Sequence, residues 1–275
     1  MPEYDFGGKV AFVTGAARGQ GESHALAYAD HGADVVALDI GESKEGVPYN
    51  LGTSDELEAT VAGVEDRGQE GLAIEADVSR AAAVEAAVEA ALDEFGRIDV
   101  LANNAGVTTF GKALDIDETT WDALLDTNLK GPWLCAKHVG RHMVERGEGG
   151  RIVNTSSNAG LVGAPFLPHY TAAKHGVVGL TKTLALELAE HDVTVNAVCP
   201  TAVETPLLAE AGAVYGDEPM EEMARVGGPS NLFGDEEMFL IQPEDVTAAF
   251  LWLSSEAARH VTGIALPVDA GFTAK

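Results

Sequence analysis

Short runs of β-branched and apolar residues alternate along the chain with longer segments of helical periodicity. The apolar runs are KVAFVTG, DVVALD, GLAIEADV, IDVLANNAG, RIVNTSS, VTVNAVCP and GIALPVD. Helical patterns cover residues 20–31, 54–68, 80–95, 119–145 and 170–190. Strands connected by helices pair in parallel. The pattern therefore predicts an α/β chain with a Rossmann fold, in which a doubly wound, seven-stranded parallel sheet has helices on both faces.

Two segments depart from this alternation. Residues 40–54 connect the second strand to its helix with about fifteen residues, where roughly two to six are usual. Residues 203–242 are acidic and irregular, with scattered glycine and proline. Long irregular segments in compact domains are often lids, so we interpret 203–242 as a substrate lid. No linker separates a second domain, and we expect 1–275 to form one domain.

A glycine-rich stretch, VTGAARGQG, ends the first strand and begins the first helix. Gly15, Gly19 and Gly21 permit a tight turn and a close approach of the backbone to a bound group. The N-terminus of the following helix attracts phosphate. The spacing G-x-x-x-G-x-G differs from the commoner dinucleotide fingerprint, but its place after the first strand favours a pyrophosphate site.

An acidic residue, Asp39, ends the second strand, 18 residues after Gly21. A carboxylate there can accept hydrogen bonds from both ribose hydroxyls of an adenosine, and it repels a 2′-phosphate. No arginine immediately around Asp39 reverses this preference. The sequence therefore favours NAD over NADP.

A candidate catalytic set follows the fifth apolar run. Tyr170 and Lys174 are four residues apart, on one face of a predicted helix, and Ser157 lies thirteen residues before the tyrosine. A free tyrosine has a pKa of roughly 10. A nearby ammonium group and a positively charged nicotinamide favour the phenolate, which brings the group towards the range where it exchanges a proton at working pH.

Together these motifs resemble the short-chain dehydrogenase/reductase family over residues 9–269. The resemblance implies that Tyr170 is the general acid/base and that Lys174 binds the nicotinamide ribose and lowers the tyrosine pKa. It implies that Ser157 hydrogen-bonds the substrate oxygen, and that Asn128 of TNLKG completes a proton relay through a water. Hydride would pass between a secondary alcohol carbon and NAD, while the protein supplies the geometry.

The same resemblance implies an NAD-binding set spread over the strand ends. Asp77 and Val78 would contact the adenine, NNAG would support the central sheet, and the segment PTAVETP would hold the nicotinamide carboxamide. Thr201 stands where the family commonly has glycine. The implied set comprises Gly15, Arg18, Gly19, Gln20, Gly21, Asp39, Ile40, Asp77, Val78, Asn104, Ala105, Gly106, Tyr170, Lys174, Pro200, Val203 and Thr205.

The long connection 40–54 begins beside the expected adenosine ribose. A subgroup of the family, the mycofactocin-associated dehydrogenases that include carveol dehydrogenases, carries such an insertion. GAARGQGESHA, YTAAKHGVVGL and LPVDAGFTAK are also similar to that subgroup. The resemblance implies that the insertion covers NAD, makes it non-exchangeable, and leaves a redox peptide as electron acceptor. The alternative is a surface insertion with no cofactor role.

Three functions remain open at this point. The first is an NAD-dependent secondary-alcohol dehydrogenase, and the second is a freely exchanging NADH-dependent ketone or 3-oxoacyl reductase. The third is a non-catalytic NAD-binding sensor, which would not need Ser157, Tyr170 and Lys174. Apolar lid residues favour a small apolar alcohol or ketone, such as the terpenoid carveol: Leu207, Leu208, Met220, Met223, Leu232, Phe233, Met238 and Phe239.

Several classes of site and partner are disfavoured. No run of 18 apolar residues suits a membrane span, the acidic N-terminus does not read as a signal peptide, and we expect a cytoplasmic protein. Cys135 and Cys199 are far apart and are expected to be buried free thiols. His138 and His142 have a spacing that could bind a metal, but we expect interface or surface histidines and no metal.

The family resemblance also implies a homotetramer, with the helices of residues 119–145 and 170–190 at the contact. HGVVGLTKTLALELA is apolar over more than one face of its helix, as expected for a helix that is buried on two sides.

The chain is strongly acidic. Forty-four acidic residues face seventeen basic ones, which gives a net charge of -27. Such a surface repels nucleic acid and anionic membranes. It also destabilises the compact state by self-repulsion unless salt screens it, so we hypothesise a high-salt cytoplasm.

This hypothesis predicts that the melting temperature rises when dilute buffer is replaced by molar KCl, because screening weakens the repulsion among the carboxylates. Thermal unfolding followed by circular dichroism checks it. A melting temperature that is no higher in molar KCl would identify an ordinary acidic protein.

Overall fold

The computed structural model describes residues 4–227 and 240–274. Its seven strands form one parallel sheet in the order β3-β2-β1-β4-β5-β6-β7. The order reverses between β1 and β4, which is the point where doubly wound sheets bind ligands. The predicted architecture is confirmed. The strands are β1 (Val10–Thr14), β2 (Asp34–Asp39), β3 (Gly71–Glu75), β4 (Val100–Asn103), β5 (Gly150–Thr155), β6 (Val193–Pro200) and β7 (Ala265–Val268).

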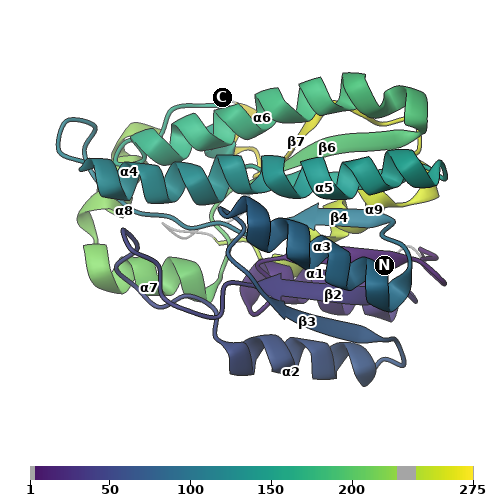
Figure 1. Cartoon of the computed structure of the whole chain (residues 1–275). Coiled ribbons are helices and arrows are strands. Elements are labelled where there is room, and N and C mark those ends of the chain that lie inside the picture. The colour runs from purple at the N-terminus through teal and green to yellow at the C-terminus, as the bar shows by residue number, and fades with distance from the viewer. Residues whose placement is uncertain (1–3, 228–239, 275) are drawn as a thin grey trace.

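Helices cover both faces of the sheet (Figure 1). On one face lie α1 (Gly19–Asp30), α2 (Ser54–Glu65) and α9 (Pro243–Ser254), and on the other lie α3 (Ala81–Phe95), α5 (Gly131–Arg146) and α6 (Pro168–Leu188). Three further helices, α4 (Glu118–Leu125), α7 (Pro206–Tyr215) and α8 (Glu218–Gly227), gather at one end of the sheet.

Alternate residues of the central strands pack into different layers. Ala11 and Val13 of β1 belong to the cluster that contains Tyr28 of α1 and Phe250 of α9. Phe12, between them, belongs to the cluster on the α3–α5 side. Successive side chains of a strand point to opposite faces, so a strand that is covered on both sides is continuously apolar. This burial explains the unbroken apolar runs of the sequence.

The helix expected over 119–145 is interrupted. The chain forms α4, a π-helical turn over Asp126–Lys130, and then α5. Pro132 has no N–H and cannot make the α-helical hydrogen bond to the carbonyl of Asn128 four residues earlier. The interruption places Asn128 in a widened turn, a form that often occurs at functional sites.

The prediction of irregular structure throughout 203–242 was wrong for its first half, which forms α7 and α8. Thr205 caps α7, because its hydroxyl oxygen accepts a hydrogen bond from the Leu208 amide (3.4 Å), and Pro206 occupies the first helical turn. A capping threonine followed by proline is a sequence pattern that predicts the start of a helix. Residues 228–239, with the predicted lid residues Leu232, Phe233, Met238 and Phe239, lie outside the described residues.

The connection 40–53 has no helix or strand, as the sequence indicated. It ends at Thr53, which forms a reciprocal capping box with Glu56 at the start of α2. Cys135 and Cys199 are buried free thiols, as predicted. Among the described residues, no helix combines the length and apolar character needed to cross a membrane.

A buried carboxylate fixes the amino ends of the central strands. Asp99, just before β4, accepts a hydrogen bond from the Val10 amide (2.9 Å) and pairs with Arg97 (2.7 Å) and Arg146 (3.1 Å). Burial acts to raise the pKa of Asp99, but the hydrogen bonds from Arg97 and Val10 and the charge of Arg146 outweigh it and leave the pKa below its usual range. Stability from such a group is present above its unfolded pKa and is lost as pH falls through its folded pKa.

We therefore expect Asp99→Asn to lower the free energy of unfolding at pH 7 by about 2–3 kcal/mol, since the arginines lose their charged partner. The difference from wild type should shrink below roughly pH 4. Urea denaturation at several pH values measures both. The control is Glu148→Gln, whose exposed carboxylate (60% exposed) should be worth no more than about 0.5 kcal/mol. Equal effects of the two substitutions would contradict the prediction.

Candidate active site

Two cavities open side by side at the carboxyl ends of the strands. The first, with about 850 Å³ of open space, lies over the ends of β1, β2, β3 and β4. The second, with about 1330 Å³, lies over the ends of β5 and β6 and beneath α7 and α8. Gln20, Thr205 and Leu207 line both. A long ligand can therefore extend from the first cavity into the second.

The glycine loop forms the floor between β1 and α1. Gly15 and Gly19 have positive φ (69° and 63°), which other residues rarely adopt. A Cβ atom on Gly21 would overlap the carbonyl oxygen of Gly15. The loop therefore requires these three glycines, and it leaves the N-terminus of α1 facing the first cavity, as a phosphate site requires.

Asp39 lies at the mouth of the first cavity, at the end of β2. Its carboxylate accepts hydrogen bonds from the amides of Ala17 (2.9 Å) and Ile40 (2.8 Å). Burial raises the pKa of this carboxyl, while the two amides and the charge of Arg18 lower it. Anchored in this way, the carboxylate keeps lone pairs for ribose hydroxyls.

The second cavity contains the candidate catalytic set. Ser157 and Tyr170 line it, and Lys174 lies one helical turn below the tyrosine, with Nζ 5.4 Å from the tyrosine ring centroid. Lys174 is 3% exposed, and its ammonium donates to the carbonyl of Thr155 (2.7 Å). The structure therefore brings together the three side chains that the sequence spacing singled out.

Burial dominates the titration of this set in the chain alone. It raises the pKa of Tyr170, and the hydrogen bond with Ser157 acts in the opposite direction. Burial lowers the pKa of Lys174 to about 8. The expected lowering of the tyrosine pKa is therefore not a property of the protein groups alone, and it needs a further positive charge beside the phenol.

Asn128 is fully buried, and both ends of its side chain bond to one residue. Its Oδ1 accepts from the Val107 amide and its Nδ2 donates to the Val107 carbonyl, both at 2.8 Å. The side chain therefore clamps the loop after β4, where Gly106 lines the first cavity.

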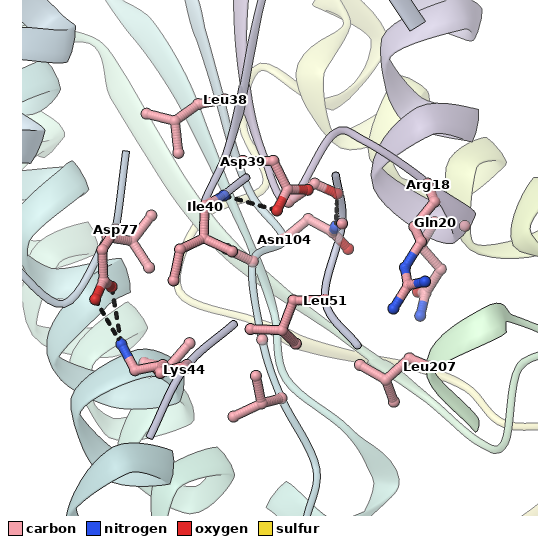
Figure 2. Close-up of a pocket in the computed structure, with 18 of the residues that line it drawn as sticks. Arg18, Gln20, Leu38, Asp39, Ile40, Lys44, Leu51, Asp77, Asn104 and Leu207 are labelled. Carbon is pink, nitrogen blue, oxygen red and sulfur yellow. Dashed lines mark hydrogen bonds and ion pairs between the residues drawn. The ribbon is translucent and has the colours of Figure 1, made fainter. Parts of the chain in front are cut away.

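The insertion 40–53 crosses the first cavity. At one side Lys44 donates to both carboxylate oxygens of Asp77 (2.7 and 2.9 Å) and to the hydroxyl of Ser79 (2.8 Å). Figure 2 shows this pair facing the cavity from the side opposite Arg18, with Leu51 between them. Gly52 packs so closely on Ala17 and Asp39 that a Cβ atom there would lie 2.7 Å from the Ala17 methyl group. The insertion therefore covers the residues expected to hold an adenosine.

Arg18 joins the insertion to α7. Its guanidinium donates to the carbonyl of Asn50 (2.6 Å) and pairs with Glu210 of α7 (2.9 Å). We call the Asn50–Arg18–Glu210 arrangement the Arg18 clasp, and it connects the insertion at the first cavity to α7 at the second. A second link is the hydroxyl of Tyr49, which accepts a hydrogen bond from the amide of Thr108 (2.9 Å), a residue that lines the second cavity.

A third apolar cluster, here the lid cluster, unites the same elements. Its buried members come from the insertion, the loop after β4, α4, the start of α6, and α7: Val47, Tyr49, Val107, Phe110, Leu124, Leu167, Ala173 and Ala211. Tyr170, Leu207, Met220 and Met223 pack against it. The insertion therefore shares one small core with Tyr170 and α7.

Most of the predicted cofactor residues meet at the two cavities. Twelve line the first: Gly15, Arg18, Gly19, Gln20, Asp39, Ile40, Asp77, Val78, Asn104, Ala105, Gly106 and Thr205. Pro200, Val203 and Tyr170 line the second. Gly21 and Lys174 line neither cavity, and nor does Asn128 of the predicted catalytic set. The carboxylate of Asp77 accepts hydrogen bonds from Lys44 and Ser79, and its contact with the adenine stays a prediction.

Sequence reasoning missed several residues at the site. Lys44 and Glu210 act through partners that are 33 and 192 positions away in the chain, and no local motif reveals such pairs. Asn158, which lines the second cavity and accepts a hydrogen bond from Ser157 (3.1 Å), also went unnoticed. The sequence feature that could have revealed Asn158 is its position directly after Ser157, the candidate catalytic serine.

One histidine of the spaced pair has a backbone partner. His142 Nε2 accepts a hydrogen bond from the Ile98 amide (3.2 Å). Within the part of the chain that the structure describes, no group of three or more His, Cys, Asp or Glu residues could hold a metal ion.

Comparison with known proteins identifies the family. The model described as short chain dehydrogenase matches residues 9–215. The chain belongs to the short-chain dehydrogenase family. It is 42% identical over 274 residues to (-)-trans-carveol dehydrogenase of Rhodococcus erythropolis, and the match covers 98% of each chain. The predictions of this family and of an oxidoreductase are confirmed.

Two solved structures of this family resemble the whole chain. One is a carveol dehydrogenase from Mycobacterium avium in complex with NAD, with 36% identity and a TM-score of 0.90, covering 99% of this chain and 100% of that chain. The other is a short chain dehydrogenase from Mycobacterium paratuberculosis bound to NAD, with 34% identity and a TM-score of 0.88, covering 98% and 100%. Both complexes agree with the sequence-based prediction of NAD as cofactor.

The geometry predicts that Tyr170→Phe reduces kcat by a factor of about 100 or more, because the variant has no hydroxyl to exchange a proton. The ring is kept, so the melting temperature and dinucleotide binding should remain close to wild type. The matched control is Tyr215→Phe in α7, which we expect to keep activity within a few-fold. A Tyr170→Phe protein with normal turnover would refute the catalytic role of this tyrosine.

Proposed function

We propose that the protein interconverts a small, uncharged secondary alcohol and its ketone by hydride transfer with NAD, using Ser157, Tyr170, Lys174 and Asn128. The observation that carries the proposal is the placement of Ser157 and Tyr170 in a cavity that joins the covered first cavity at Gln20, Thr205 and Leu207. A dinucleotide that spans both cavities would bring its reactive end to the tyrosine.

The described residues fit NAD. The three glycines leave the N-terminus of α1 open to a pyrophosphate, and the anchored carboxylate of Asp39 suits ribose hydroxyls and opposes a 2′-phosphate. When bound, NAD supplies the hydride acceptor and a positive ring.

Each catalytic side chain then has one role. Tyr170 takes the hydroxyl proton of the alcohol, and Ser157 holds the substrate oxygen beside it. Lys174, anchored to the Thr155 carbonyl, holds a positive charge under the tyrosine ring. Burial raises the pKa of Tyr170, and the positive charge of a bound nicotinamide would act in the opposite direction. Asn128 fixes the Val107 backbone beside this site.

The second cavity favours an apolar, uncharged substrate. Among the described residues that line it, none is charged, and Leu207, Leu208, Met220 and Met223 contribute apolar walls. A terpenoid alcohol such as carveol fits this chemistry, and relatives with that name support it. The alternative, a 3-oxoacyl reductase, must admit a polyanionic thioester carrier, which a chain of net charge -27 repels.

We further propose that the insertion 40–54 retains NAD through turnover and that electrons leave through an external acceptor such as a redox peptide. Three sets of contacts of the insertion support the retention of NAD: the Lys44–Asp77 ion pair, the Arg18 clasp and the lid cluster. Each of them holds the insertion to an element that borders one of the two cavities.

We also propose a homotetramer in which α4, α5 and α6 meet neighbouring chains. Trp121 of α4, Trp133 of α5 and Leu186 of α6 are 37%, 45% and 83% exposed in the single chain. Large apolar side chains on these helices support burial in an assembly.

The decisive experiment is to denature freshly purified, extensively dialysed protein and to identify and quantify the released nucleotide by absorbance and mass. We expect about one NAD per chain. Glu210→Gln should release NAD about tenfold faster, because it breaks a partly buried charge pair of the clasp. The matched control is Glu218→Gln, whose pair with Lys112 is exposed, and whose release rate should equal that of wild type.

Two outcomes would contradict these proposals separately. Protein without nucleotide that turns over with added NAD would remove the retained-cofactor proposal and leave the dehydrogenase. A screen of neutral cyclic alcohols without any turnover, in protein that retains NAD and is supplied with an artificial acceptor, would remove the substrate assignment.

A further inference from the structure

The loop after β4 forms part of the wall of the second cavity. Thr108 and Phe110 line this cavity. Thr109 between them is fully buried, and its hydroxyl forms a hydrogen bond with Nε2 of His169 (2.6 Å). Val107, at the start of the loop, lines the first cavity. The path of this short segment therefore determines where Thr108 and Phe110 stand beside a molecule in the second cavity.

Two consecutive residues of this loop are held by different parts of the chain. Asn128, in the π-helical turn, bonds to both the amide and the carbonyl of Val107 (2.8 Å each). The amide of Thr108 instead donates to a side chain of the insertion, the hydroxyl of Tyr49 (2.9 Å). The insertion thus contributes one of the hydrogen bonds that set the position of a wall of the second cavity.

This hydrogen bond is sheltered from water. Tyr49 and Thr108 are 7% and 8% exposed, and the ring of Tyr49 packs in the lid cluster with Val107 and Phe110. A buried amide that loses its acceptor costs about 1–3 kcal/mol. Without the phenol oxygen, the loop would gain free energy by moving its amide to another partner, and Thr108 would move with it.

We propose that Tyr49 is a positioning residue for the substrate: by holding the Thr108 amide, the insertion 40–53 shapes the second cavity and helps to select the alcohol by size. The inference rests on the proposed interconversion of an alcohol and its ketone. In that function Ser157 and Tyr170 hold the substrate oxygen, so the carbon skeleton packs against the other walls, including the one that Thr108 forms. The insertion therefore acts at both cavities, as a cover of the first and as a support for a wall of the second.

The test is Tyr49→Phe, with kcat/KM measured for cyclohexanol and a series of its alkyl-substituted derivatives. An artificial electron acceptor is supplied where the protein retains NAD. The ratio of kcat/KM between the preferred alcohol and one of a different size does not depend on the fraction of active enzyme. We expect this ratio to fall about three- to tenfold, as for the loss of one hydrogen bond, because the wall is no longer fixed. An unchanged ratio would overturn the proposal.

A second buried tyrosine provides the matched control. The hydroxyl of Tyr28 in α1 forms a hydrogen bond with the hydroxyl of Ser254 in α9 (2.7 Å), and neither residue lines a cavity described above. Tyr28→Phe removes a buried hydrogen bond of the same kind, so it should lower the melting temperature about as much as Tyr49→Phe. The ratio between the two alcohols should stay at the wild-type value. If Tyr28→Phe shifts that ratio equally, a general loss of stability is responsible and the proposal fails.

Amide hydrogen exchange gives a second readout, which needs no turnover. In Tyr49→Phe, peptides that contain residues 107–111 should exchange at least about threefold faster, because the Thr108 amide has lost its acceptor. Tyr28→Phe should leave exchange in these peptides unchanged. Unchanged protection in Tyr49→Phe would overturn the proposal, whatever the activity of the protein.

The two levels of inference fail in different ways. Absence of turnover with every alcohol, in wild-type protein that retains NAD and is supplied with an acceptor, would overturn the proposed function and this inference with it. Active wild type with an unchanged ratio in Tyr49→Phe would remove only the role of Tyr49 and leave the dehydrogenase.

Discussion

The contact between Gly21 and the carbonyl of Gly15 is the constraint on which the site depends. A Cβ atom at residue 21 would overlap that oxygen, so α1 can start this close to β1 only with glycine there. Asn104 donates to the same carbonyl (3.3 Å) and to that of Thr14 (3.2 Å), which attaches the end of β4 to the loop. The hydroxyl of Thr14 accepts from the amides of Asn104 and Ala105. The ends of β1 and β4 are thereby fixed to each other where they line the first cavity.

Sequence reasoning succeeded where a residue's role follows from its place on one element. The glycine turn, Asp39 at the end of a strand and the spacing of Tyr170 and Lys174 on one helix are local patterns, and the fold places them as expected. The strands were readable because burial on both faces leaves few polar positions in the central ones. Helix α7 was missed although Thr205 and Pro206 mark its start, because glycine and proline elsewhere in the segment obscured this local signal.

Contacts between distant segments could not be predicted in this way. Lys44 of the insertion meets the carboxylate of Asp77, which seemed assigned to the cofactor, and Arg18 meets Glu210 rather than facing an open cleft. Such pairs depend on the path of the chain in space. The insertion was recognisable by its length alone, whereas its attachment to the lid through the lid cluster required the structure.

The two ion pairs that hold the insertion, Lys44–Asp77 and Arg18–Glu210, respond differently to salt from the charges on the surface of this anionic protein. With seventeen basic residues against forty-four acidic ones, cations are scarce, and two of them hold the cover of the first cavity. Lys44 and Arg18 are only 12% and 16% exposed, whereas Lys112, in an ion pair on the surface, is 60% exposed. Mobile ions screen exposed charges far more than sheltered ones. An increase in ionic strength therefore weakens the repulsion between surface carboxylates but leaves the two sheltered ion pairs of the insertion largely intact. High salt can thus stabilise the fold without weakening the binding of a ligand in the first cavity.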